Sequence, residues 1–159
     1  MNTLLQQVQV TLSNGTQIEA IAYIDAVANF CMGERYKDVF ENWDFEIVRT
    51  IVAYHLAKNT ITVIQKDGVI EGVHMWYHCN KDDDWSLVEE WREDDPNGDA
   101  IFMAFLFSED TVTFKKIVLD LLSREPSVLH KHLIGLRKKS GKPTKVKYTP
   151  KLFTKILKL

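Results

Sequence analysis

Ala100–Phe107 reads Ala-Ile-Phe-Met-Ala-Phe-Leu-Phe and contains no polar residue. A continuous apolar run of this length predicts a strand that is buried on both faces. Ser108-Glu109-Asp110 follows it, and Ser108 or Asp110 is the expected cap of a helix over residues 111–124. Pro126 ends that helix. A buried strand that leads directly into an amphipathic helix indicates a sheet covered by helices.

The segment before this run contains the clearest turn of the chain, Lys66-Asp67-Gly68. Residues 60–65 and 69–79 on its two sides are rich in residues that favour strands. Asp-Gly between two such segments predicts an antiparallel hairpin.

The N-terminal part has two interpretations. Residues 6–12 alternate polar and apolar side chains, which predicts a half-buried strand. Asn14-Gly15 favours a hairpin turn after it, but Thr16–Glu19 has the spacing of a capping box, and apolar residues then recur at helical spacing. We favour a helix over residues 17–32, ended by Gly33.

A second helix is predicted over residues 44–57, with Asp44 as its N-cap and Asn59 after its end. Nearer the C-terminus, residues 130–137 predict a strand, residues 138–143 a turn and residues 144–148 a partner strand. Pro150 is suited to the first turn of a final helix.

The chain has 159 residues, of which 45% are apolar and 26% charged, and it shows no repeat or linker. These values exclude a disordered, collagen-like or disulfide-scaffold protein. The order of elements predicts one α/β (α+β) domain over residues 1–159, with a central, mostly antiparallel sheet and flanking helices. No transmembrane run or signal peptide is apparent, so we expect a cytoplasmic protein in which Cys31 and Cys79 are reduced and buried.

The formal net charge of −2 hides two opposed halves. Residues 1–114 contain 7 Lys or Arg and 20 Asp or Glu, a net charge of −13, whereas residues 115–159 contain 13 and 2, a net charge of +11. The acidic half peaks in an expected loop over residues 80–99. The basic half is concentrated in residues 131–159. Such asymmetry indicates charged partners or an assembly of acidic and basic surfaces.

The order of elements resembles that of the GNAT N-acyltransferases over most of the chain. Four features carry the resemblance. They are the Lys66-Asp67-Gly68 hairpin, the acidic insert that ends at Gly98-Asp99, the apolar strand that enters helix 111–124, and the late Leu136–Lys142 hairpin. The chain is most similar to divergent members of that family, the RTX toxin-activating acyltransferases and GNAT-like proteins of tailed phages. The resemblance therefore implies a phage-encoded protein, made in the host cytoplasm, that is a component of the virion.

One turn departs from the family pattern. In active GNAT enzymes the strand that corresponds to residues 100–107 is followed by a glycine-rich loop. This loop and the N-terminus of the next helix bind the pyrophosphate of the cofactor. The corresponding turn here, Phe107–Val112, has no glycine and no basic residue, and it contains Glu109 and Asp110. We therefore expect that the protein has no cofactor. The alternative is that it binds acyl-CoA. The His and Asp by which the toxin acyltransferases act have no evident counterpart, because residues 100–107 include no acid.

Other candidates for chemistry are weaker. Glu71 is a possible general base, although a solvated carboxylate on an edge strand is the favoured interpretation. The histidines are expected to be surface or partly buried, and His74 and His78 lie about 13 Å apart on a strand, too far to share one metal ion. The acidic run at residues 82–84 lacks the spacing of a calcium loop. We predict no metal site.

The basic C-terminal segment is the strongest candidate for a binding surface, because residues 131–158 contain ten Lys or Arg and no acid. Clustered lysines suit an acidic protein surface or, without base reading, the phosphates of nucleic acid. The predicted partner-binding residues are Lys131, Arg137, Lys138, Lys139, Lys142, Lys145 and Lys147. The predicted acidic partner surface consists of Asp82, Asp83, Asp84, Glu89 and Glu90.

Three functions follow. The leading hypothesis is a non-enzymatic GNAT-like binding or structural protein that docks through its basic segment. Its partner is an acidic protein surface or the acidic loop of a neighbouring copy. The first alternative is a divergent N-acyltransferase with an acyl-CoA or acyl-carrier-protein donor and a cleft between strands 69–79 and 100–107. The second alternative is a nucleic-acid-associated protein.

Overall fold

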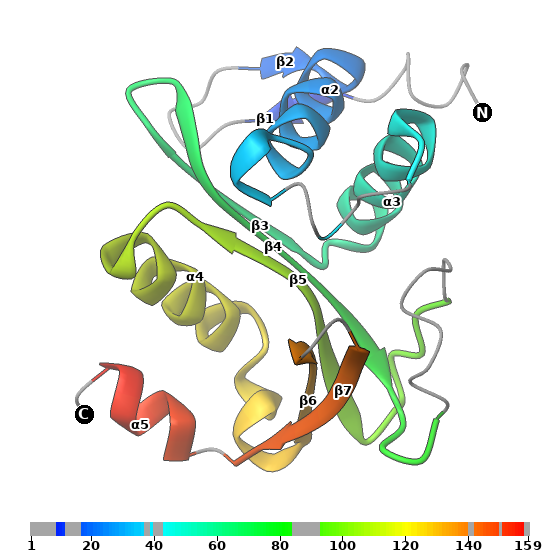
Figure 1. Ribbon diagram of the computed structural model, residues 1–159, viewed down its shortest axis with the longest axis vertical. Coiled ribbons are helices and arrows are strands. Elements are labelled where there is room, and N and C mark those ends of the chain that lie inside the picture. The colour runs from blue at the N-terminus through cyan, green and yellow to red at the C-terminus, as the bar shows by residue number, and fades with distance from the viewer. Residues whose placement is uncertain are drawn as a thin grey trace. The chain divides into compact units, whose positions relative to one another are not determined.

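A computed structural model describes residues 9–11, 17–36, 39, 43–83, 93–139, 142–149 and 151–157. The chain divides into two compact units, residues 1–59 and 60–159, which are shown in Figure 1 and described separately below. The prediction of a single domain stays a prediction.

The first unit contains a short hairpin followed by helices. Val10 and Ile18 are paired in its two antiparallel strands. Residues 17–19 therefore form a strand, and the helix that we predicted from residue 17 begins at Ala20. The pairing of β1 with β2 agrees with the hairpin alternative, whereas the helix that we favoured covers only the later part of its predicted range; Asn14 and Gly15 themselves lie outside the described residues. The elements are β1 (Gln9–Thr11), β2 (Gln17–Glu19), α2 (Ala20–Cys31), the 3-10 helix η1 (Glu34–Tyr36) and α3 (Phe45–Lys58).

Helix α3 has the caps that its sequence predicts. The Asp44 side chain accepts a hydrogen bond from the backbone N–H of Glu46, and Asn59 ends the helix in the left-handed conformation with φ 58°. Arg49 of α3 donates to the Asp25 carboxylate of α2 with an N–O distance of 2.6 Å. This ion pair joins the two helices of the unit.

The second unit is a five-stranded sheet with the order β3-β4-β5-β6-β7. Every neighbouring pair is antiparallel except β5 and β6. The fold is thus mixed α/β (α+β) with a mostly antiparallel sheet, as predicted. The elements are β3 (Ile61–Lys66), β4 (Val69–Cys79), β5 (Ala100–Ser108), α4 (Thr111–Arg124), the 3-10 helix η2 (Pro126–His130), β6 (His132–Lys139), β7 (Lys142–Tyr148) and α5 (Lys151–Leu157).

The β3–β4 hairpin turns at Asp67 and Gly68, which both have positive φ, 53° and 79°. Positive φ at both central residues is typical of a tight two-residue hairpin turn. The ladder has one irregularity, where Ile64 pairs with Gly72 but the next residue pairs with Ile70. Glu71 is the extra residue of this bulge.

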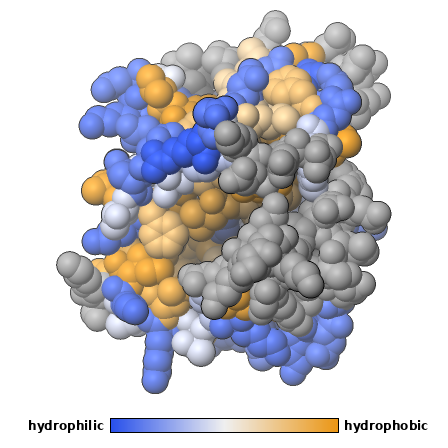
Figure 2. All heavy atoms as spheres, in the orientation of Figure 1, coloured by the Kyte–Doolittle hydropathy of each residue, from blue (hydrophilic) through white to orange (hydrophobic). Residues whose placement is uncertain are grey.

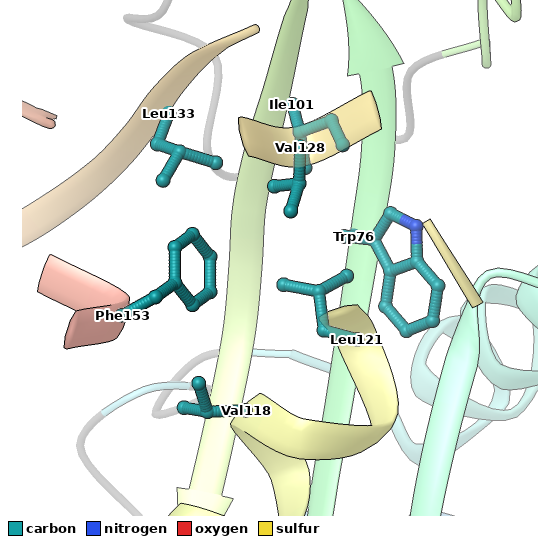
Figure 3. Close-up of a cluster of buried hydrophobic side chains, with 7 residues drawn as sticks. All are labelled: Trp76, Ile101, Val118, Leu121, Val128, Leu133 and Phe153. Carbon is teal, nitrogen blue, oxygen red and sulfur yellow. The ribbon is translucent and has the colours of Figure 1, made fainter. Parts of the chain in front are cut away.

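Helix α4 lies against one face of the sheet. A Cβ atom at Gly72 would lie 2.5 Å from Thr113 Cγ2, so the close approach of α4 to β4 requires glycine at this position. Further along the helix, the buried residues point toward a common centre with side chains from β4, β5, β6, η2 and α5, as Figure 3 shows. This cluster contains Trp76, Ile101, Val118, Leu121, Val128, Leu133 and Phe153.

The C-terminal hairpin begins later than its sequence predicts. Pro126–His130 forms η2, so β6 starts at His132 rather than at residue 130. Gly135 lies under the ring of Tyr148, since a Cβ atom there would be 3.0 Å from Cε2 of the tyrosine. Figure 2 shows apolar side chains reaching the surface where α4 and α5 lie.

Both cysteines are buried thiols, as expected. Burial raises the pKa of the Cys31 thiol, so it remains protonated. In the part of the chain that the structure describes, no helix has the length and apolar character needed to span a bilayer.

Candidate functional site

The basic segment occupies an edge of the sheet. Strands β6 and β7 are paired from Leu133 with Tyr148 to Lys139 with Lys142. At about 3.3 Å per residue, this hairpin separates its tip from its base by about 20 Å. Lys138, Lys139 and Lys142 therefore lie at the tip, whereas Lys131 and Lys147 lie near the base.

The outer edge of β7 is the side away from β6. Proline has no backbone N–H and is tolerated in a strand where that position faces an open edge. Pro143 therefore indicates that alternate residues, including Lys145 and Lys147, direct their backbone groups outward. The Lys147 side chain is exposed, as are those of Lys151 and Lys155 on α5.

The remaining predicted basic residues have defined places in the backbone. Lys131 is half-buried and ends η2, with its N–H directed to the Val128 carbonyl. Arg137 lies on β6 opposite Thr144, and Lys145 lies on β7 opposite Leu136. The structure thus places all the predicted basic residues except Lys131 on one hairpin, and Lys131 directly precedes it.

The acidic connection between β4 and β5 adjoins the base of this hairpin. The N–H of Lys81 donates to the Asp99 carboxylate at 2.8 Å, and the N–H of His132 donates to the Asp99 carbonyl at 3.1 Å. Asp83 accepts a hydrogen bond from the backbone N–H of Asn80. Asp82 is exposed. The predicted surface residues Asp84, Glu89 and Glu90 lie outside the described residues.

The turn before α4 provides the carboxylate that caps the helix N-terminus. Asp110 is the N-cap, and its side chain accepts a hydrogen bond from the N–H of Thr113 at 2.8 Å. This backbone hydrogen bond lowers the pKa of Asp110 below its usual range, so the carboxylate is ionised. The N–H of Glu109 is also used, by the Glu71 carbonyl at 3.0 Å. An anion at this helix end would meet a negative charge instead of free N–H groups.

Glu71 differs from the edge-strand carboxylate that we expected. Strand β4 lies between β3 and β5, so Glu71 is in an interior strand, where it is half-buried at the bulge. Within the described part of the chain, its carboxylate has no hydrogen-bond partner that would tune it as a base.

A cluster that the sequence did not predict surrounds His78. Its Nδ1 lies 3.0 Å from Asp94 Oδ2, and its Nε2 lies 2.7 Å from Glu125 Oε1. The side chains of His78, Asp94 and Glu125 are only 12%, 3% and 18% exposed. Trp76 Nε1 donates to the same Glu125 oxygen at 3.3 Å. These partners are 16 and 47 residues from His78, so no local spacing could have indicated them.

The other histidines differ from one another in how far they are buried. His74 is fully buried, which corrects the expectation of a surface or partly buried ring, and its ring centroid lies 5.2 Å from that of Trp76. His130 and His132 are exposed. Among the described residues, no three His, Cys, Asp or Glu side chains are arranged to hold a metal ion.

Strands β4 and β5, between which we predicted a cleft for an acyltransferase, are paired along their length. Strands β4 and β5 are paired from Gly72 with Ser108 to Cys79 with Ala100, with one irregularity after Met75. The ladder that opens is the parallel one, because the pairing of β5 with β6 ends at Met103 and Gly135 while both strands continue.

No protein-family model matches the chain, and no curated protein matches it in sequence.

Proposed function

We propose that this chain is a non-enzymatic, GNAT-like binding protein whose basic C-terminal segment docks onto an acidic protein surface. The observation that carries the proposal is the position of the basic residues on an edge hairpin and the helix after it. Lys147, Lys151 and Lys155 are exposed there, and β7 has an open backbone edge. The resemblance to phage-encoded proteins makes virion assembly the setting that we propose for this docking.

The tip of the hairpin is the preferred docking element. Asp99 lies beside the start of β6, so the acidic connection lowers the local potential at the base of the hairpin. The tip is about 20 Å away, which exceeds the screening length of about 8 Å at physiological salt. Lys138, Lys139 and Lys142 therefore retain their full attraction for an acidic partner.

The divergent N-acyltransferase is the second candidate. The parallel ladder that opens after Met103 leaves backbone groups of β5 and β6 unpaired with each other near α4, which favours a ligand of extended shape. The Asp110 cap opposes it, because the carboxylate occupies the helix end that would bind a pyrophosphate.

A binding comparison with the full chain separates these functions. Fluorescently labelled poly-L-glutamate, a DNA duplex and acetyl-CoA are titrated with the protein at low and physiological salt. We expect binding to poly-L-glutamate and none to acetyl-CoA. Saturable micromolar binding of acetyl-CoA overturns the proposal in favour of the acyltransferase. Tighter binding to DNA than to poly-L-glutamate, with a steep loss in salt, overturns it in favour of nucleic acid.

A further inference from the structure

Strand β7 is the last strand of the sheet, and within the described part of the chain it is paired on one side only, with β6. The register of the hairpin determines which backbone groups of β7 point away from β6. Pro143 lies opposite Lys138 and has no N–H, so this pair belongs to the positions that are not hydrogen-bonded across the hairpin. Every second residue of an antiparallel strand has the same setting. The N–H and C=O groups of Lys145 and Lys147 therefore point outward.

The outward positions of β7 belong to the basic segment. Positions two apart share one face of a strand, so residues 145 and 147 lie on the same face. The side chain of Lys147 is exposed there, and those of Lys151 and Lys155 on the following helix α5 are exposed as well. The edge thus offers backbone donors and acceptors together with positive charge.

We propose that β7 binds an extended acidic segment of the partner as an additional strand of the sheet. This inference rests on the proposed function, because it specifies the form in which the acidic partner is recognised. The segment runs from the hairpin tip along the outer edge of β7 and is held by backbone hydrogen bonds to Lys145 and Lys147. Directly opposed residues of paired strands have Cβ atoms about 5 Å apart. Acids at alternate positions of the segment therefore lie opposite the lysines.

The composition of β7 argues against a second copy of this chain at the same edge. Two β7 strands paired through their outer edges bring lysines against lysines, and like charges opposite each other destabilise a strand pair. Lysine and proline on an edge strand are a common protection against such self-association. A strand with alternate Asp or Glu relieves this repulsion. In strand addition the main chain supplies affinity, and the alternate side chains supply specificity.

Amide hydrogen exchange, followed by nuclear magnetic resonance of the full chain, tests the pairing. The probe is a blocked peptide in which Glu alternates with Thr, a residue that favours strands. At saturation it should slow exchange of the Lys145 and Lys147 N–H groups by about tenfold or more, because a hydrogen-bonded amide exchanges only when its bond opens. The N–H of Thr144, which is paired with Arg137 of β6, is the internal control and should change far less.

The outcomes separate this inference from the proposed function. If poly-L-glutamate binds but the peptide does not slow exchange at Lys145 and Lys147, the additional strand is wrong and docking onto an acidic surface stands. If neither ligand binds, the proposed function fails and the inference fails with it. Slow exchange of both amides in the free protein would show that the edge is already covered and would also overturn the inference.

Two variants at one position isolate the backbone contribution. Lys145→Pro and Lys145→Ala remove the same ammonium group, but only proline also removes the outward N–H. Pro143 shows that β7 accepts proline at a position of this kind. We expect Lys145→Pro to bind the peptide about three- to tenfold more weakly than Lys145→Ala, which corresponds to one lost backbone hydrogen bond. Equal affinities of two folded variants contradict the additional strand, and the exchange measurement on the wild type decides the question if Lys145→Pro fails to fold.

Discussion

The two ends of α4 each carry a carboxylate, but in opposite electrostatic settings. Asp110 precedes the positive N-terminus, where the helix dipole and a backbone N–H favour its charge. Glu125 follows the C-terminus, where the dipole opposes a negative charge, and it is held by His78 and Trp76. The first carboxylate is exposed and needs only its own helix. The second is mostly buried and depends on residues of a distant strand.

This difference assigns the ends separate roles. At the N-terminal end the Asp110 carboxylate caps the helix, and for this reason we do not favour a pyrophosphate-binding enzyme in our proposal. The Glu125 end couples the acidic connection to the segment that starts the basic hairpin.

The largest effect is expected at the middle of the helix, which supports both ends. Leu121 is 1% exposed and belongs to the buried cluster of the second unit. Leu121→Ala should lower the free energy of unfolding by about 2–5 kcal/mol in urea denaturation. Leu119→Ala, at a half-exposed position of the same helix, should change it by less than about 0.5 kcal/mol. Equal losses of stability in the two variants would contradict the burial of Leu121 in this cluster.

The next effect concerns the C-terminal end. Glu125→Ala leaves His78 Nε2 and Trp76 Nε1 without their acceptor, so the free energy of unfolding should fall by about 1–3 kcal/mol at neutral pH. Glu109→Ala, at the other end of the helix, removes a half-exposed carboxylate and serves as the control. A smaller loss for Glu125→Ala than for Glu109→Ala would contradict the importance of the His78 contacts.

A smaller effect, with a distinct pH dependence, is expected at the N-terminal end. The hydrogen bond from Thr113 lowers the pKa of Asp110, so the ionised carboxylate stabilises the folded state above its unfolded pKa. This contribution is lost as the pH falls through the lowered pKa. Asp110→Ala should therefore be less stable than the wild type at neutral pH, and the difference should narrow in acid.

Asp110→Asn is the matched variant, since asparagine caps a helix without a charge. Thermal denaturation of all three proteins at several pH values measures the effect. A constant difference between the wild type and Asp110→Asn at every pH would contradict a contribution from the charge.

Local signals predicted most of the fold. Asp44 and Asn59 gave the two ends of α3, Asp67-Gly68 gave the β3–β4 turn, and the apolar run at residues 100–107 gave β5. The start of α2 was misplaced because Thr16–Glu19 satisfies a capping box as well as a strand, and pairing with β1 decides between them. Tertiary pairing of this kind is not encoded in the spacing of one segment.

The candidate site was less accessible to sequence reasoning. The clustered lysines allowed the basic segment to be predicted from the sequence. Which of these lysines lie at the tip of the hairpin and which near its base depends on the register of β6 and β7. The His78 cluster had no local signal, because its members come from a strand, a connection and a helix end. Asp110 as a cap was predictable, since acid residues before an amphipathic helix are typical N-caps.

We propose that the hairpin tip binds an acidic partner, and a binding titration can decide this. Binding of labelled poly-L-glutamate is measured by fluorescence anisotropy for the wild type and for a variant with Lys138, Lys139 and Lys142 changed to Glu. The matched control changes Lys58, Lys66 and Lys116, which are exposed and outside the basic segment. We predict that the tip variant loses about tenfold or more in affinity while the control binds like the wild type. Equal affinity of the tip variant and the wild type would contradict the claim.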